Sequence, residues 1–214
     1  MTNLEFNGHL HKVSHPFISD RLTQMRDVKT PSAIFRKNLQ EIATFLTYEA
    51  LADIPLEARV VETPMQLSKQ PCLPNLAPAL VSILRAGNAM VDGALALSRN
   101  SPVGMIGLKR NEETLEPEDY FLRLPDQLNS RMTLVCDPML ATGGSLIRAI
   151  DILKQANATQ IRVVCLLAAP EGVKKVLSVH QDIHIWTAAL DDHLDDKGYI
   201  VPGLGDAGDR IYGT

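Results

Sequence analysis

The chain has 214 residues, enough to bury a substantial hydrophobic core within one domain. Its formal charge of −4 and isoelectric point near 5.8 argue against a general nucleic-acid or membrane-surface binder, which needs a basic face. No apolar run reaches the length of a membrane span, and the first residues lack a signal-peptide pattern, so we expect a cytoplasmic protein.

Residues 1–30 are predicted to form an N-terminal arm. Their first half is a polar, glycine-containing stretch, which favours a solvated segment over a metal site for His9, His11 and His15. A helix is then predicted from Thr30–Ser32 onward, because apolar residues recur at helical spacing in a core-facing stripe of Phe35, Leu39, Ile42 and Leu46. Two basic residues on this helix are expected on its solvated face, with contact to an anionic effector as the alternative: Arg36 and Lys37.

The stretch from Val60 to Pro78 contains four prolines, so we expect a loop with one short edge strand at Val60–Val61. A buried strand over residues 79–84 follows, and it leads through Arg85 into a helix over residues 89–97. Arg85 would then stand at the carboxyl end of a parallel strand, where α/β folds bind their ligands. The alternative is an arginine that pairs with a structural carboxylate.

A further strand, over residues 103–108, runs into the most polar stretch of the chain, residues 109–125. The many charges there, together with Pro117, predict an exposed and mobile segment. Its functional interpretation is a lid that excludes water from an active site, and its alternative is a solvated hairpin.

The segment Leu134 to Ser145, LVCDPMLATGGS, joins a strand, a small-residue turn and a helix. Its glycines, Gly143 and Gly144, let the backbone approach a ligand, and the following helix offers unpaired N–H groups to an anion. Asp137, at the end of the strand, would repel a bare phosphate but suits ribose hydroxyls or the Mg²⁺ that accompanies a polyphosphate. The pattern predicts a phosphate-binding loop, with a purely structural turn as the alternative. No Gly-Lys-Ser/Thr follows, which excludes a nucleotide P-loop.

Two more apolar strands, over residues 161–168 and 183–188, flank a helix around residues 171–180. Strands without interruption that alternate with helices predict an α/β fold with a parallel sheet covered on both faces. The acidic cluster at 191–196 is expected to be a solvated turn, because a Ca²⁺ loop needs alternating ligands and a glycine hinge. The scattered cysteines Cys72, Cys136 and Cys165 are not expected to form a disulfide or a metal site, and the apolar runs around Cys136 and Cys165 predict buried, reduced thiols.

The last seventeen residues, 198–214, contain five glycines and are predicted to be too loop-like for a core element. Closely spaced glycines let backbone N–H and C=O groups line a flat ligand. This segment is therefore a second candidate for ligand recognition.

Five segments resemble the uracil phosphoribosyltransferases of the type I phosphoribosyltransferase superfamily: TPSAIFRKNLQEIATFLTYEAL, SILRAGNAMVDG, KRNEETLEP, DPMLATGG and PGLGDAGD. The resemblance implies one domain over residues 1–214 with the parallel-sheet type I fold, an N-terminal helical arm and a C-terminal base-binding hood. It implies a pentosyltransferase of pyrimidine salvage that converts uracil and 5-phosphoribosyl-1-pyrophosphate (PRPP) to UMP and pyrophosphate with Mg²⁺.

The resemblance also implies roles for residues. Catalytic roles fall on Arg85, Arg110, Asp137 and Asp206. PRPP would be bound by these four and by the rest of the 137–145 loop, namely Pro138, Met139, Leu140, Ala141, Thr142, Gly143, Gly144 and Ser145. Mg²⁺ would be held mainly through PRPP. Uracil would be read by Ile200, Gly205, Asp206 and Ala207, because a backbone offering N–H, C=O and N–H complements its acceptor–donor–acceptor edge, whereas cytosine would leave buried groups unpaired.

Four positions depart from the family pattern, and none carries the expected chemistry: Ser82, Asn88, Lys109 and Asn111. Lys109 would add a second positive charge beside Arg110.

The expected partners are uracil and PRPP, in a homodimer or larger homo-oligomer, with GTP as an activator in some relatives and without nucleic acid or membrane. Two rivals remain, an RNA-binding regulator on the same fold and a transferase for a purine base. The acidic composition disfavours the first rival and the carboxyl-terminal motif disfavours the second.

Overall fold

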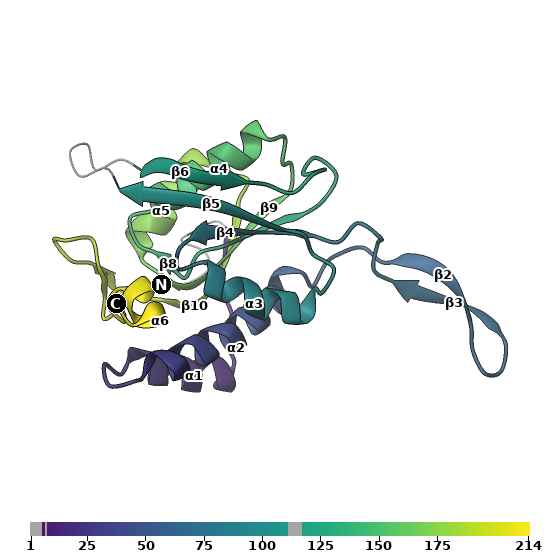
Figure 1. Cartoon of the computed structure of the whole chain (residues 1–214), viewed down its shortest axis with the longest axis horizontal. Helices are drawn as coiled ribbons and strands as arrows, with labels where there is room; N and C mark the ends of the chain where they lie inside the picture. The colour runs from purple at the N-terminus through teal and green to yellow at the C-terminus, as the bar shows by residue number, and fades with distance from the viewer. Residues whose placement is uncertain (1–5, 7, 111–116) are drawn as a thin grey trace.

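The computed structural model describes residues 6, 8–110 and 117–214, and its centre is an eight-stranded sheet (Figure 1). Seven strands follow the order β1-β10-β9-β7-β4-β5-β6, and β8 pairs with β9. The pairs are parallel except for the antiparallel β5 and β6, so the predicted parallel sheet is confirmed with one antiparallel edge. The strands are β1 Leu10–Lys12, β4 Ala79–Leu84, β5 Val103–Arg110, β6 Pro117–Arg123, β7 Thr133–Cys136, β8 Met139–Leu140, β9 Ile161–Ala168 and β10 His184–Leu190.

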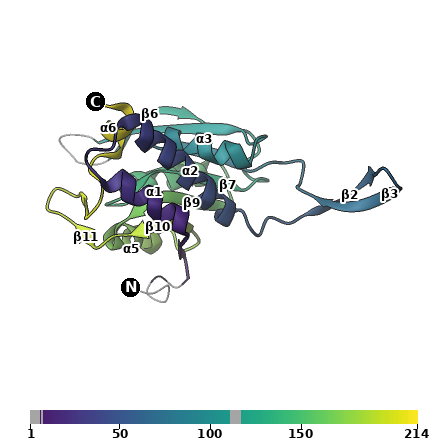
Figure 2. The same cartoon turned by 90° about the horizontal axis from the view of Figure 1, so that it is seen from below.

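Helices cover both faces of this sheet (Figures 1 and 2). Successive side chains of a strand point to opposite faces. In β7, Leu134 joins the core cluster that contains the first three helices, whereas Val135 joins the cluster that contains the next two. Burial on both faces explains why the central strands are largely apolar, with exceptions such as Ser82 of β4 and Arg162 of β9. The helices are α1 Pro16–Arg26, α2 Ser32–Ala50 and α3 Asn88–Leu97 on one face, and α4 Gly144–Gln155 and α5 Pro170–Val179 on the other.

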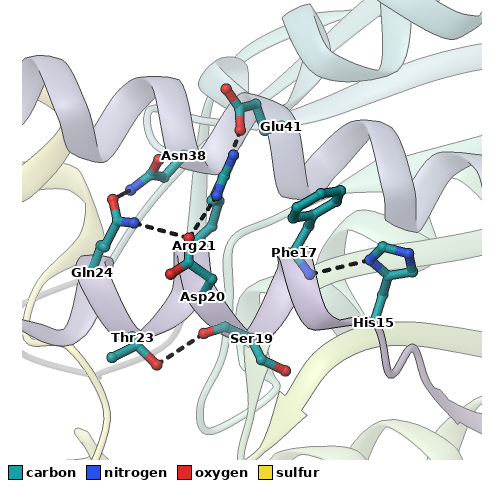
Figure 3. A network of polar contacts seen from close by, with 9 residues as sticks. All are labelled: His15, Phe17, Ser19, Asp20, Arg21, Thr23, Gln24, Asn38 and Glu41. Carbon is teal, nitrogen blue, oxygen red and sulfur yellow. Dashed lines mark hydrogen bonds and ion pairs between the residues drawn. The ribbon is translucent and has the colours of Figure 1, made fainter.

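Helix α2 carries the predicted core stripe, because the following side chains are fully buried: Phe35, Leu39, Ile42 and Leu46. Polar contacts join α2 to α1 (Figure 3). Arg21 Nε donates to Glu41 Oε2 at 2.8 Å, and Asn38 Nδ2 donates to Gln24 Oε1 at 3.2 Å. Asn38 is only 5% exposed, so its bond satisfies an amide that would otherwise be buried without a partner. The two helices therefore pack as one layer under the sheet.

The N-terminal segment is not a solvated arm throughout, so that prediction was wrong. Leu10–Lys12 forms β1 and pairs with β10. The His11 ring stacks on Trp186 with centroids 4.5 Å apart, and its Nε2 lies 2.9 Å from His184 Nδ1. His15 caps α1 by accepting from a backbone amide. A strand of three residues leaves too short a pattern to detect, and its partner lies near the other end of the chain.

The proline-rich stretch forms a hairpin, so the edge strand predicted at Val60–Val61 is confirmed as part of β2, whereas the loop predicted around it was wrong. Strands β2 Glu57–Glu62 and β3 Leu67–Cys72 pair in antiparallel fashion and project from the body of the molecule (Figures 1 and 2). Pro64 lies in the turn between them, and Pro71 lies in β3 opposite Ala58. A two-stranded ribbon has only edge strands, and an edge strand tolerates a residue that lacks the N–H group.

The carboxyl-terminal segment contributes to the core, contrary to the prediction. After a small hairpin of β11 His193–Leu194 and β12 Ile200–Val201, the chain forms helix α6 Ala207–Tyr212. Four apolar side chains of this segment belong to the core cluster of α1 and α2: Ile200, Leu204, Ala207 and Ile211. Tertiary contact overrides the loop-forming tendency of the glycines. Within the described part of the chain, no helix is long and apolar enough to cross a membrane.

Candidate active site

A pocket of about 240 Å³ lies at the carboxyl ends of β4 and β7, which are neighbours in the sheet. Arg85 follows β4 and Asp137 follows β7, and both line the pocket. The structure thus brings together two segments that the sequence singled out separately, at the edge of the sheet where α/β folds bind ligands. Leu108 of β5 also lines it, and the loop and first turn of α4 supply Met139, Leu140, Ala141, Thr142, Gly143, Gly144, Ser145 and Leu146.

The backbone of the 137–145 loop is fixed by β9 and α5. The Pro138 carbonyl accepts hydrogen bonds from the Leu166 and Leu167 amides, both at 3.0 Å. Through these bonds Pro138 supports the wall of the pocket, and it does not itself line the pocket. At Gly172 of α5, an added Cβ would lie 2.0 Å from the Ala141 carbonyl oxygen, so only glycine permits this close approach.

The start of α4 offers the pocket an anion site. Gly143 precedes the helix with a φ of 80°, in the left-handed region that glycine adopts without strain. No side chain among the described residues caps the first turn of α4. The amides of Gly144 and Ser145, residues that line the pocket, are thus without a side-chain acceptor at the positive end of the helix dipole.

Asp137 is poised to change its charge near neutral pH. Burial raises the pKa of this carboxyl to about 7, and a hydrogen bond from the Met139 backbone amide opposes part of the rise. The charged form would be favoured by a cation or by hydroxyl groups of a ligand. Burial also raises the pKa of the neighbouring Cys136 thiol to about 12, so this thiol stays protonated and is no nucleophile.

Arg85 stands on a tight turn after β4. The Leu84–Arg85 peptide bond is cis, and an added Cβ at Gly87 would lie 2.2 Å from the Cys136 carbonyl oxygen, so the turn packs closely against the end of β7. The Arg85 side chain pairs with no carboxylate among the described residues, which argues against a structural ion pair. Its guanidinium group is exposed and lies 5.8 Å from the centroid of the Tyr212 ring.

The carboxyl-terminal segment contacts both walls of the pocket. An added Cβ at Gly198 would lie 3.3 Å from Thr142 Cγ2 of the loop, and the Tyr212 hydroxyl donates to the Arg85 carbonyl at 3.0 Å. The predicted base-reading residues lie between these two contacts in the chain. Ile200 and Ala207 are buried, whereas Gly205 is exposed with a φ of 81°.

Asp206 does not line the pocket. It is exposed and caps α6, where its Oδ1 accepts from the Asp209 amide at 3.0 Å. This capping bond is the contact that the structure assigns to Asp206, and the sequence did not predict it. A carboxylate at a helix N-terminus also interacts favourably with the helix dipole.

An arginine–aspartate pair that the sequence missed fixes the carboxyl-terminal segment. Asp191 is 7% exposed and accepts two hydrogen bonds from Arg26, at 2.6 and 2.8 Å. The same aspartate accepts from the Gly203 amide, and Arg26 donates to the Gly203 carbonyl. The prediction of a solvated turn was therefore wrong for Asp191. Nothing in the acidic run distinguishes Asp191 from its neighbours, because its arginine partner is distant in the chain.

The predicted lid is partly a regular hairpin. Strand β6 occupies 117–123, and Asp119 on it pairs with Arg148 of α4, which lowers the pKa of the Asp119 carboxyl through hydrogen bonding. Lys109 pairs with Glu118 at 3.5 Å and does not line the pocket. The tip at 111–116 lies outside the described residues, and Arg110 ends β5 with its side chain outside the description.

Comparison with known proteins agrees with this geometry. The family model described as uracil phosphoribosyltransferase matches residues 12–214. The chain belongs to the uracil phosphoribosyltransferase family. The reaction of this family converts uracil and PRPP to UMP and pyrophosphate, and the chain is a glycosyltransferase of the pentosyltransferase class.

Individual relatives agree along nearly the whole chain. A uracil phosphoribosyltransferase from Streptococcus pyogenes (serotype M5, strain Manfredo) is 52% identical over 207 residues, which are 97% of this chain and 99% of the relative. The solved structure of the AQ2163 protein from Aquifex aeolicus is 40% identical with a TM-score of 0.90, and the match covers 95% of this chain and 97% of that one.

A more distant structure agrees in fold alone. A hypoxanthine-guanine phosphoribosyltransferase from Bacillus anthracis is 13% identical with a TM-score of 0.51, over 75% of this chain and 79% of that one. Together with the sheet described above, this likeness confirms the type I phosphoribosyltransferase fold predicted from the sequence.

Proposed function

We propose that this protein transfers the phosphoribosyl group of PRPP to N1 of uracil in the pocket between β4 and β7, in the cytoplasm. The proposal is based on one observation. Arg85, Asp137 and the uncapped start of α4 line the same pocket, and the carboxyl-terminal segment contacts both of its walls. Cationic, acidic and N–H groups in one pocket suit a ligand that carries phosphates and a ribose.

Each part of the site has a separate task. The amides at the start of α4 and the hydroxyls of Thr142 and Ser145 bind the 5-phosphate, Asp137 accepts hydrogen bonds from the ribose hydroxyls, and Arg85 binds the pyrophosphate. Arg110, at the end of β5, adds a second positive charge when the lid closes. The backbone around Gly205 and Ala207, with Ile200 beside it, reads the edge of the base, and Asp206 orients the sugar near it.

The described residues suit Mg²⁺ that arrives with PRPP rather than a resident metal. No group of three or more His, Cys, Asp or Glu among them is arranged to hold a metal ion, whereas a single carboxylate, Asp137, lines the pocket. Mg²⁺ commonly binds one or two carboxylates together with substrate phosphates. When bound, the ion neutralises charge on the leaving pyrophosphate.

The chain's own residues favour departure of pyrophosphate. The bond between ribose C1 and the pyrophosphate oxygen breaks with its electron pair on the oxygen, where Arg85 stabilises the added charge. Uracil N1 then forms the bond to C1 and loses its proton to solvent. The carboxylate of Asp137 and the fixed loop hold the ribose so that N1 and C1 meet in line.

The proposal is tested by incubation of the purified protein with Mg²⁺, PRPP and uracil, following pyrophosphate and UMP together. Equal amounts of both products are the expected result. A parallel reaction with hypoxanthine should give no nucleotide, and one with added GTP tests whether this protein shares the activation that the resemblance implies for some relatives. Pyrophosphate without UMP, or no product at all, would contradict the proposed reaction.

Arg85→Ala should lower turnover by about tenfold or more at saturating uracil and PRPP, because it removes the charge that stabilises the leaving group. The matched control is Arg99→Ala, since Arg99 is exposed and does not line the pocket. Steady-state rates of the two variants decide the matter. An unchanged rate for Arg85→Ala would remove this residue from the mechanism.

We further propose that the protein is a homodimer held partly by the β2–β3 hairpin. A two-stranded hairpin is marginally stable by itself in water, and this one projects from the body of the molecule (Figure 1). It also carries large apolar side chains that are exposed. These side chains are 59% to 90% exposed: Val60, Met65 and Leu67. A second copy that covers the hairpin would bury them.

Charge on the hairpin should therefore split the dimer. The double variant Val60→Asp, Leu67→Asp is expected to elute as a monomer in size-exclusion chromatography with light scattering, because desolvated carboxylates disfavour the interface. Val28→Asp serves as control, since Val28 is 87% exposed and lies outside the hairpin. A dimer that survives the double change would exclude the hairpin as its interface.

A further inference from the structure

We propose that Tyr212 is a positioning residue that couples occupancy of the base site to the pyrophosphate arginine, Arg85. The inference rests on the proposed function, because it assigns the base to the carboxyl-terminal segment and pyrophosphate to Arg85. It starts from one contact between these two parts of the site. The Tyr212 hydroxyl donates to the Arg85 carbonyl at 3.0 Å, and the Arg85 guanidinium lies 5.8 Å from the centroid of the Tyr212 ring.

Tyr212 thus touches both the backbone and the side chain of Arg85. The hydrogen bond fixes the turn, and the face of the ring attracts the cation. No carboxylate among the described side chains orients this guanidinium. The contact that orients it is the one with the Tyr212 ring. The Arg85 carbonyl accepts a second bond from the Asn88 amide at 3.3 Å, a longer contact than that from Tyr212.

Helix α6 connects this contact to the base-reading backbone. It is a helix of six residues, Ala207 to Tyr212, so the residue proposed to read the base begins it and the residue that holds Arg85 ends it. Backbone hydrogen bonds make such a short helix one rigid piece. A movement of Ala207 when the base binds is therefore transmitted to Tyr212.

Further contacts join α6 to the layer of α1 and α2 and to the segment before it. Arg36 of α2 donates to the Ile211 carbonyl at 2.6 Å. Arg210 donates to the Asp27 carbonyl at 2.6 Å and to the Leu204 carbonyl at 3.1 Å, and its guanidinium lies 4.7 Å from the Phe35 ring centroid. The bond from Tyr212 joins α6 to the turn after β4.

The coupling is measurable with pyrophosphate and uracil, which bind together without reacting. Pyrophosphate is titrated in the presence of Mg²⁺ by calorimetry, with and without saturating uracil. In the unchanged protein, uracil should tighten pyrophosphate binding by about threefold or more, in the range of ordinary coupling between sites. In Tyr212→Phe, which keeps the ring and loses the hydroxyl, uracil should leave the affinity for pyrophosphate unchanged.

Steady-state kinetics give a second readout. Tyr212→Phe should lower kcat/KM for PRPP by about fivefold with little change in melting temperature, because one hydrogen bond to a functional backbone group is lost. Tyr212→Leu, which also loses the ring, should lower it further. Tyr48→Phe is the matched control, since Tyr48 is 62% exposed on α2 and has no part in the pocket.

The outcomes separate this inference from the proposed function. Retained coupling and unchanged kcat/KM in Tyr212→Phe, with an unchanged protein that forms UMP, would overturn the coupling role alone. If Tyr212→Phe lost stability and bound uracil and pyrophosphate more weakly to an equal extent, Tyr212 would have a structural role and the inference would also be overturned. Failure of the unchanged protein to form UMP would overturn the proposed reaction itself.

Discussion

Gly172→Ala is expected to lower kcat/KM for PRPP by about tenfold or more, although Gly172 lies on α5 and lines no part of the pocket. The added Cβ would stand 2.0 Å from the Ala141 carbonyl oxygen and 3.1 Å from that of Leu140, both backbone atoms of the 137–145 loop. Neither helix nor loop backbone can yield as a side chain does. The loop must therefore move, and its binding groups lose their alignment.

The same change should lower the free energy of unfolding by about 1–3 kcal/mol, as overpacking does. A decrease is informative because helix propensity alone predicts an increase: alanine is favoured over glycine within a helix by about 1 kcal/mol. Urea unfolding and PRPP kinetics of the same preparations measure both effects. Lys175→Ala, on the exposed side of α5, is the control and should change neither. A stabilised and fully active Gly172→Ala protein would show that the loop does not depend on this contact.

Asp137→Asn is expected to reduce turnover by about 100-fold while it stabilises the ligand-free protein at alkaline pH. The carboxyl has a pKa of about 7 in the folded protein, raised by burial. Its stabilising contribution is fully present below the pKa of the unfolded chain near 3.8 and is lost as pH rises to about 7, because the folded state binds the proton more tightly. Asparagine has no charge to bury, so the variant avoids this loss.

The difference in unfolding free energy between variant and parent should grow from near zero at pH 4 to about 2–4 kcal/mol at pH 8. Urea unfolding at several pH values measures it. Asp53→Asn provides a control in which the difference in unfolding free energy should have the opposite sign. Hydrogen bonds from Arg162 lower the pKa of the Asp53 carboxyl, so its loss should destabilise the protein at pH 8. Equal stability of Asp137→Asn and parent at pH 8 would mean that the carboxylate is not destabilised in the folded protein.

Local patterns in the sequence were sufficient for the central sheet and its helices. Strands β4, β7 and β9 are largely apolar because both of their faces are buried, and α2 shows its core stripe at helical spacing. The loop after β7 was also recognisable from the sequence, because its small residues, its acid and its glycines are adjacent in the chain. Family motifs then linked this loop to Arg85.

Tertiary contacts decided the features that the sequence concealed. Strand β1 is too short to show a pattern, and it forms because the edge of β10 offers unpaired backbone groups. Glycines alone suggested a loop at the carboxyl terminus, yet burial of Ile211 and its neighbours against α2 produced a helix. In both cases the stabilising partner lies far away in the chain.

The sequence by itself determined the class of fold, the family and the position of the phosphate-binding loop, because each depends on residues that are close together in the chain. Only the tertiary structure decided how the site is held: by Gly172 beneath the loop, by the pair of Arg26 and Asp191 behind the carboxyl-terminal segment, and by Tyr212 on Arg85. These contacts join distant segments. Their stabilising effect depends on burial and close approach, which no local pattern records.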